Sequence, residues 1–368
     1  MRNRLLASPR FHRWASGFWL TRPIAHRRAS ALFDIVAGFV YAQVLLACVQ
    51  LKLFELLAEG PQTAAQLAPR LGLSEAAALR LLNAATALQL AQRRSHQRYG
   101  LGMLGATLVG NAAVLAMVEH HAALYADLRD PVALLRGETG PTSLGHYWPY
   151  AGAAGASTSA RLPGTDVARY TALMAASQPL VASEILDSYA FAQHRQVLDI
   201  GGGNGSFLVQ VAQRHPQLGL TLFDLPAVAA QASAHLASLG LSQRVTVAGG
   251  SFLETPLPRG ADLVTLVRVV HDHDDAAVLA LLQAVHRALP PGGTVLIAEP
   301  MSHTPGAEAM GDAYFGFYLL AMGQGRPRSA EELCALLRQA GFSAPRLLAN
   351  RMPLQTRVLV AKASVATP

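Results

Sequence analysis

The chain has 368 residues, of which 51% are hydrophobic and only 14% are charged. This length suggests two domains and the apolar content supports a sizeable core, which excludes wholesale disorder. The formal net charge is +7, and residues 1–30 account for all of it, because they hold seven arginines and no acid: Arg2, Arg4, Arg10, Arg13, Arg22, Arg27 and Arg28. The rest of the chain is neutral, which argues against a nucleic-acid-binding face spread over the protein.

Cysteine usage and hydropathy indicate the cellular compartment of the protein. Cys48 and Cys334 supply neither a disulfide framework nor a set of metal ligands, which fits a reducing cytosol. The first twenty residues alternate arginine with aromatics and lack the apolar core of a secretory signal. Residues 35–51 are uncharged, a run long for a surface helix and short for a membrane span, which favours a helix buried in a subunit interface. We therefore expect a cytoplasmic protein.

Residues 1–30 form a predicted basic aromatic arm. Its arginines are interleaved with Phe11, Trp14, Phe18 and Trp19, a composition typical of a segment at a lipid interface. The alternative is a solvated or partner-packed arm, because Pro9 and Pro23 leave little room for one long amphipathic helix. The first interpretation predicts peripheral contact with a membrane surface through residues 1–30.

Residues 31–138 predict an all-helical, winged-helix-like domain. A helix enters at Gln62-Thr63, Gly72 follows it, and Ser74 caps the next helix, whose apolar residues recur with a period of 3.6. Residues 93–102 then form a short hairpin-like wing. DNA binding and dimerisation both use this outline, but residues 75–89 contain a single basic residue, Arg80, so dimerisation is favoured.

Residues 139–190 follow as a linker with substrate-pocket helices. The stretch is rich in Gly, Ala, Ser and Pro, and it contains the aromatic group His146, Tyr147, Trp148 and Tyr150. These side chains either line a pocket or pack between domains.

Residues 191–368 alternate strands with helices, the pattern of a doubly wound α/β sheet. The expected strands lie near 197–200, 219–223, 244–248, 262–267, 293–299, 345–349 and 356–362. The expected helices lie near 204–214, 226–239, 275–288 and 330–340. The last two strands are close in sequence, which suits an antiparallel pair at the sheet edge.

A glycine-dense turn follows the first of these strands, in VLDIGGGNGSFL. Such a turn lets backbone approach a ligand, and the helix after it favours negative charge. Asp199, Gly201, Gly203 and Gly205 fit the D-x-G-x-G-x-G spacing of S-adenosylmethionine (SAM) enzymes, in which the acid can face the cationic amino group. The dinucleotide pattern fails because Ser206 stands at its final glycine.

Two more strand ends add nucleoside contacts. Asp224 ends the second strand, where an acid can accept hydrogen bonds from a ribose diol whichever cofactor is present. Gly250, Ser251 and Phe252 follow the third strand, where an aromatic ring can cover an adenine face.

The stretch VRVVHDHDD places His271 at the carboxyl end of a strand, where open α/β sheets bind ligands. A neutral imidazole there can take a proton from a hydroxyl while a methyl group leaves sulfur. The cluster also invites a metal interpretation, but consecutive residues in a turn diverge, and Asp274 or Asp275 is a suitable helix cap, so we expect no metal. Glu299 ends the next strand, where it hydrogen-bonds the histidine, sits near substrate, or is an ordinary strand-end carboxylate.

The motifs DIGGGNG, FDLP, GGSF, VRVVHDHDD and LIAEPM, in this order and spacing, resemble those of the plant and bacterial SAM-dependent small-molecule O-methyltransferases. The resemblance spans nearly the whole chain. It implies a class I SAM-methyltransferase fold with a Rossmann-like sheet, and an N-terminal domain that drives homodimer formation. It further implies that His271 is the catalytic base flanked by Glu299, and that Asp224, Gly250, Ser251, Phe252 and Arg268 contact SAM.

The chain departs from the family pattern at three places. His273 replaces the tryptophan of the usual H-D-W, Ser251 replaces the aspartate of G-D-F, and a second glutamate of the plant enzymes falls near Pro327. The last departure puts a two-glutamate clamp on the base in doubt. A relative that binds SAM for chemistry other than methylation therefore remains an alternative, as does an O-methyltransferase for a phenolic or antibiotic-type metabolite.

Residues 10–57, from RFHRWASGFW to KLFELL, resemble the start of the carotenoid O-methyltransferases of purple photosynthetic bacteria. The resemblance implies an apolar, hydroxylated substrate, namely the tertiary 1-hydroxyl of an acyclic carotenoid such as hydroxyneurosporene or demethylspheroidene. A tertiary alcohol is a very weak acid, so the base must act as the methyl group transfers and not beforehand.

Overall fold

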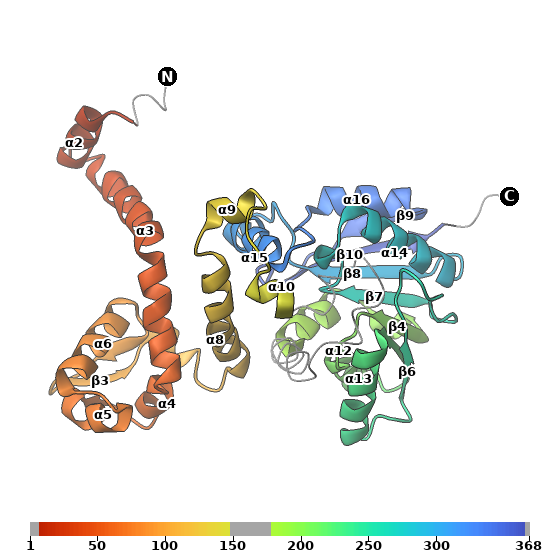
Figure 1. Cartoon of the computed structure of the whole chain (residues 1–368), viewed down its shortest axis with the longest axis horizontal. Coiled ribbons are helices and arrows are strands. Elements are labelled where there is room, and N and C mark those ends of the chain that lie inside the picture. The colour runs from red at the N-terminus through yellow and green to blue at the C-terminus, as the bar shows by residue number, and fades with distance from the viewer. Residues whose placement is uncertain (1–6, 148–177, 365–368) are drawn as a thin grey trace. The chain divides into compact units, whose positions relative to one another are not determined.

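A computed structural model of the protein describes residues 7–147 and 178–364 (Figure 1). The chain divides into two compact units, Met1–Glu119 and His120–Pro368. Arg2 and Arg4 of the arm lie outside the described residues, as do Trp148, Tyr150 and much of the predicted linker over residues 139–190.

The arm is helical. Helix α2 spans Pro9–Gly17 and α3 spans Arg22–Gln50, and the two prolines stand in the first turns, where a missing N–H leaves no hydrogen bond unmade. The prolines therefore start helices here, and α3 continues through residue 30 into the apolar stretch without a break. By length and composition alone, α3 is long and apolar enough to cross a membrane, and its most apolar window is only 11% buried within the protein.

The rest of the first unit is a helix-turn-helix with a small wing. Thr63 caps α5 in a reciprocal box with Gln66, Gly72 ends it in the left-handed conformation, and Ser74 caps α6. Three short strands pair antiparallel in the order β1-β3-β2. The elements are α4 (Leu53–Ala58), β1 (Gln62–Thr63), α5 (Ala64–Leu71), α6 (Glu75–Ala87), β2 (Ala91–Arg93), β3 (Arg98–Leu101), α7 (Met103–Ala106) and α8 (Ala112–Asp127), the last of which runs into the second unit. The helices and wing predicted at residues 62–102 are present.

The second unit is built on a sheet whose strand order, within the described residues, is β6-β5-β4-β7-β8-β10-β9. The first five strands are parallel, and β10 is antiparallel to both of its neighbours. The strands are β4 (Gln196–Ile200), β5 (Gly219–Asp224), β6 (Val245–Gly249), β7 (Leu263–Val267), β8 (Thr294–Glu299), β9 (Phe342–Leu347) and β10 (Arg357–Ala363). The predicted strands lie within three residues of these bounds, and the closing antiparallel pair is confirmed.

Helices cover both faces of this sheet (Figure 1). Along β4, Val197 joins a core with α12, α13 and the helical residues 178–188, while Leu198 joins a second core with α14 and α16. The alternation follows from the two-residue period of a strand buried on both faces. The helices are η2 (Phe191–Gln193), α12 (Ser206–Arg214), α13 (Pro226–Ser238), η3 (Val270–Asp272), α14 (Asp275–Ala288) and α16 (Ala330–Gln339).

A smaller helical layer belongs to the same unit. It packs the end of α8 with α9 (Pro131–Leu135), α10 (Ser143–Tyr147), the π-helix η4 (Ala309–Tyr314) and α15 (Phe315–Met322) around a core that includes Leu124, Leu144 and Met322. Because β4, β5, β7 and β8 are parallel, their carboxyl ends share one edge of the sheet. The predicted site residues therefore meet at that edge, next to the π-helix.

Candidate active site

The turn after β4 adopts a conformation that its glycines make possible. Gly201, Gly203 and Gly205 all have positive φ, and a Cβ on Gly201 would lie 2.6 Å from Val269 Cγ2. A Cβ on Gly203, by contrast, would meet no atom within 4 Å. The turn therefore packs tightly against the sheet on one side and is open at Gly203, as a ligand-binding loop requires.

Asp199 points its carboxylate at this turn. Its Oδ1 accepts a hydrogen bond from Thr265 Oγ1 at 2.6 Å, and its Oδ2 would lie 2.8 Å from a Cβ on Gly202. Asp199 is 1% exposed, and Oδ2 has no hydrogen-bond partner among the described residues. Burial raises the pKa of Asp199 to about 7, against the Thr265 hydrogen bond, and the charge of Asp224 raises it further.

Asp199 Oδ2 is thus a buried carboxylate oxygen without a hydrogen-bond donor, and buried polar atoms normally have a partner. This atom tests whether the site fits SAM. The α-amino group of SAM is a cation with three donors, and binding at Oδ2 would satisfy this oxygen and favour the ionised acid. The cradle and its acid therefore fit SAM.

Asp224 braces the same turn. Its Oδ2 accepts from the Gly203 N–H at 2.8 Å, and its Oδ1 accepts from the Leu225 N–H at 2.7 Å. The Asp224 carbonyl in turn accepts from the Gly250 N–H at 2.8 Å. A Cβ on Gly250 would lie 2.9 Å from Phe223 Cζ, so the close approach of these strand ends requires glycine. The predicted ribose acid therefore also fixes the glycine loop.

Ser251 and Phe252 take part in different contacts. The Ser251 N–H donates to Thr255 Oγ1 and the Ser251 hydroxyl accepts from the Leu253 N–H, so this side chain stabilises its own turn. The Phe252 ring meets the His273 imidazole edge to face, with centroids 5.1 Å apart. His273, which stands where the family has tryptophan, therefore packs on the predicted adenine-covering ring.

His271 lies in η3, just beyond β7, between two acids. Its backbone N–H donates to Glu299 Oε2 at 3.0 Å, and its Nδ1 is 3.9 Å from the same oxygen. Its Nε2 lies 3.1 Å from Asp272 Oδ1, a contact that suits an ion pair but has poor hydrogen-bond geometry. The predicted contact between Glu299 and the histidine is therefore present, and it is made to the backbone.

The charges around His271 set its protonation. Burial lowers its pKa, but the carboxylates of Asp272 and Glu299 outweigh burial and hold the pKa above its ordinary value, while Arg268 opposes them. Burial also raises the pKa of Glu299. The imidazole is thus a stronger base than one in water, at the cost of being protonated over a wider pH range.

Arg268 adopts the left-handed conformation with φ of +59°, which is strained for a residue with a side chain. Its N–H donates to the Ala298 carbonyl at 2.8 Å. Burial raises the pKa of Tyr314 to about 12, and the charge of Arg268 opposes that rise as it opposes the rise at His271. The cation predicted to contact SAM is therefore close enough to the base and to the π-helix to influence the protonation of both.

Several residues near the base have no signal in the sequence motifs. The Phe315 ring packs on the His271 imidazole with centroids 5.8 Å apart, and Tyr314 beside it bonds His121 Nε2 at 2.8 Å. π-helical turns such as η4 often occur at functional sites. A single π-turn has no local sequence signature, so the sequence motifs give no sign of these contacts.

The structure also shows what Asp274 and Asp275 bind, and where the segment that contains Pro327 lies relative to the base. Asp274 precedes α14 without a side-chain cap, and Asp275 instead binds Arg326 and Arg328. Pro327 lies in a segment whose neighbour, Arg326, donates its N–H to the His271 carbonyl at 2.9 Å. The segment thus reaches the base, but proline brings no carboxylate there.

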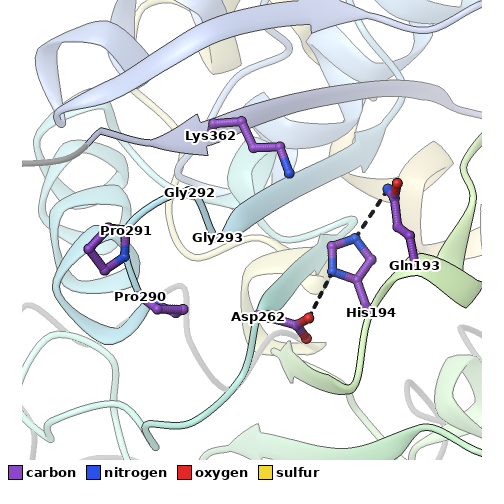
Figure 2. Close-up of a pocket in the computed structure, with 8 residues that line it drawn as sticks. All are labelled: Gln193, His194, Asp262, Pro290, Pro291, Gly292, Gly293 and Lys362. Carbon is purple, nitrogen blue, oxygen red and sulfur yellow. Dashed lines mark hydrogen bonds and ion pairs between the residues drawn. The ribbon is translucent and has the colours of Figure 1, made fainter.

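A pocket of about 290 Å³ lies at the opposite edge of the sheet, at the amino ends of the strands, and holds none of the predicted site residues (Figure 2). There His194 Nδ1 pairs with Asp262 Oδ2 at 3.4 Å. Within residues 7–147 and 178–364, no group of three or more His, Cys, Asp or Glu residues is arranged to hold a metal ion.

Comparison with known proteins assigns the family. An O-methyltransferase domain matches residues 125–343, and an O-methyltransferase dimerisation domain matches residues 33–111, which supports a homodimer. The demethylspheroidene O-methyltransferase of Cereibacter sphaeroides is 44% identical, over 95% of this chain and 91% of the relative. That of Rhodobacter capsulatus is 42% identical, over 98% of this chain and 88% of the relative.

A solved structure shares the fold. Human N-acetylserotonin methyltransferase in complex with SAM superposes with a TM-score of 0.75, covering 92% of this chain and 98% of that chain at 22% identity. The sheet, the glycine cradle and the two domain matches agree, and the chain belongs to the family of SAM-dependent O-methyltransferases.

Proposed function

We propose that the enzyme methylates the tertiary 1-hydroxyl of an acyclic carotenoid such as demethylspheroidene, with His271 as the general base. The substrate follows from the two relatives at 42–44% identity, which carry that activity in their names over nearly the whole chain. The observation that carries the mechanism is the placement of His271 between Asp272 and Glu299, at the same sheet edge as the Asp199 cradle.

SAM supplies an electrophilic methyl group when it binds. In our proposal Asp199 binds the amino group of SAM, Asp224 binds its ribose and Phe252 covers its adenine. The remaining contacts of the cradle come from six residues: Gly201, Gly203, Gly205, Gly250, Ser251 and Arg268. These contacts orient the methyl donor toward the substrate oxygen, and such positioning is a large part of catalysis in a bimolecular transfer.

His271 takes the hydroxyl proton as the new O–CH₃ bond forms and the S–CH₃ bond breaks. The products are the methyl ether, S-adenosylhomocysteine and a protonated imidazole, which Asp272 and Glu299 stabilise by their charge. Because a tertiary alcohol is far too weak an acid to ionise beforehand, the proton must move during the transfer.

Labelled SAM tests this proposal. The full-length enzyme is incubated with methyl-labelled SAM and either demethylspheroidene in detergent micelles or a catechol, and the extracted product is counted. We expect label in the carotenoid ether. Label in the catechol product alone would replace the carotenoid by a phenolic substrate. Tight SAM binding with no labelled product from either would favour a relative with non-methylating chemistry.

Residues 1–30 are, in the same proposal, a peripheral membrane arm of an otherwise cytoplasmic enzyme. A carotenoid dissolves in the membrane, so an enzyme that acts on one gains from visiting its surface. Support comes from exposed apolar side chains set among the arginines of α2 and α3, with Trp14 55%, Trp19 74% and Ile24 56% exposed.

A further inference from the structure

Arg328 is buried completely, at 0% exposure, and it is the largest of the fully buried side chains in the described part of the chain. A buried guanidinium is costly unless its donors are satisfied. Here Nε donates to Asp275 Oδ1 at 2.8 Å, Nη1 to the Val270 carbonyl at 3.0 Å, and Nη2 to the His273 carbonyl at 2.7 Å. Nη2 also pairs with Asp275 Oδ1 at 2.6 Å.

The two carbonyls that Arg328 binds lie on either side of His271. Val270 precedes the base, His273 follows it by two residues, and the planar guanidinium spans both. The same segment meets the base itself, because the Arg326 N–H donates to the His271 carbonyl, and a Cβ on Gly325 would overlap that oxygen. The turn that carries His271 is thus held along its backbone.

Arg328 also connects the base to the strand that carries Glu299. The Arg328 carbonyl accepts a hydrogen bond at 3.0 Å from the N–H of Ser302, three residues beyond Glu299. Glu299 in turn accepts from the His271 N–H at 3.0 Å. The base and its flanking acid are therefore bound to one segment.

We propose that Arg328 is a positioning residue that sets the orientation of the His271 imidazole through the backbone on both sides of it. The segment acts on the base through the Arg328 side chain and through the backbone hydrogen bond from Arg326. The inference rests on the proposed role of His271 as base.

A double-mutant cycle separates positioning from mere structural support. Turnover of labelled SAM with demethylspheroidene is measured for the wild type, Arg328→Lys, His271→Ala and the double variant, together with the Kd for SAM and the Tm. Lysine keeps the charge but cannot span two carbonyls. We expect Arg328→Lys to lower kcat by about 10- to 100-fold in the wild type, since small misplacement of a catalytic group has effects of that size.

In the His271→Ala background we expect Arg328→Lys to change kcat by less than about twofold, because the group it positions is gone. The Kd for SAM should change by less than about twofold in both backgrounds. Arg214→Lys is the matched control, since Arg214 also pairs with an aspartate, Asp187, but at the end of α12 remote from the glycine turn. This control should leave kcat unchanged.

Two other outcomes for kcat overturn the inference. An equal loss of kcat in both backgrounds would make Arg328 a general structural support, and an unchanged kcat in the wild type would remove any role. If Arg328→Lys fails to fold, Gly325→Ala disturbs the same turn through the His271 carbonyl and must show the same dependence on His271. If His271→Ala alone leaves kcat unchanged, the proposed base is wrong, and that result is distinguishable from the failure of Arg328.

Discussion

Glu299 Oε2 accepts a hydrogen bond from the backbone N–H of His271 at 3.0 Å, while its Oε1 is buried without a hydrogen-bond partner among the described residues. The acid at the end of β8 thus holds the turn that carries the base. It also presents a charge 3.9 Å from the imidazole Nδ1. The Glu299 carboxylate therefore both holds the backbone of the proposed base in place and raises the pKa of its imidazole.

Replacing His271 by alanine should lower kcat by about two to four orders of magnitude, the usual contribution of a general base. The Kd for SAM should remain within about twofold, because His271 is not part of the glycine cradle. His303→Ala is the control, since His303 is 77% exposed and should leave turnover unchanged. Turnover equal to wild type in His271→Ala would mean that positioning alone drives the transfer.

The pH dependence of kcat/KM should follow His271, whose pKa is raised above its ordinary 6.5 by Asp272 and Glu299 against the effect of burial. A base acts when neutral, so activity should rise with pH through that raised pKa. Asp272→Asn removes one negative charge, lowers the pKa of His271, and should move the midpoint to lower pH.

His273→Gln is the control for that profile. Burial lowers the pKa of His273, so this histidine is neutral where His271 titrates, and its loss should leave the midpoint in place. An unmoved midpoint in Asp272→Asn would show that this acid does not tune the base.

Asp199→Asn should weaken SAM binding by about 10- to 100-fold, since a hydrogen bond to a charged group contributes about 1.5–3 kcal/mol. Asparagine can still accept from Thr265, but it presents an amide in place of the unpaired Oδ2. Calorimetric titration with SAM measures the effect, with Asp187→Asn, a partly exposed acid paired with Arg214, as the control. SAM binding equal to wild type would remove Asp199 from the cradle.

Asp199 also predicts a stability change in the SAM-free enzyme. Its pKa is 3.8 in an unfolded chain and about 7 in the folded protein. Between these values the folded state holds a proton that the unfolded state has lost, so stability should fall as pH rises from about 4 to about 7. Asp199→Asn should flatten this decline in Tm, and an identical decline in the variant would contradict the assignment.

Deleting residues 1–21 removes α2 and leaves α3 to begin at Arg22. We expect weaker co-sedimentation with phosphatidylglycerol vesicles, because each arginine near an anionic surface contributes about 1 kcal/mol, an attraction that salt screens. The Kd for SAM should not change. Neutral phosphatidylcholine vesicles are the control, and undiminished binding of the deleted protein to anionic vesicles would assign the arginines to solvent.

Much of the fold follows from local sequence. The strands of the second unit are continuous apolar runs, and Gly201, Gly203 and Gly205 allow positive φ wherever the chain goes next. The caps at Thr63 and Ser74 act on N–H groups three residues away, so their helices were predictable from neighbouring residues alone. The motif order then placed His271 and Glu299 at one sheet edge, because parallel strands end together.

Long-range contacts decided the rest. Arg328 lies 53 residues from Asp275 along the chain, and nothing in GRPRS distinguishes its buried arginine from the exposed Arg326 beside it. The contact of Phe315 with His271 likewise depends on the path of a π-helix. The amino-acid sequence by itself determined the family, the glycine turn after β4 and the +7 charge of residues 1–30, because those features are local or compositional. Only the tertiary structure decided that Phe315 packs on the base and that Arg328 binds the turn around it, because burial and pairing are set by segments that meet across the fold.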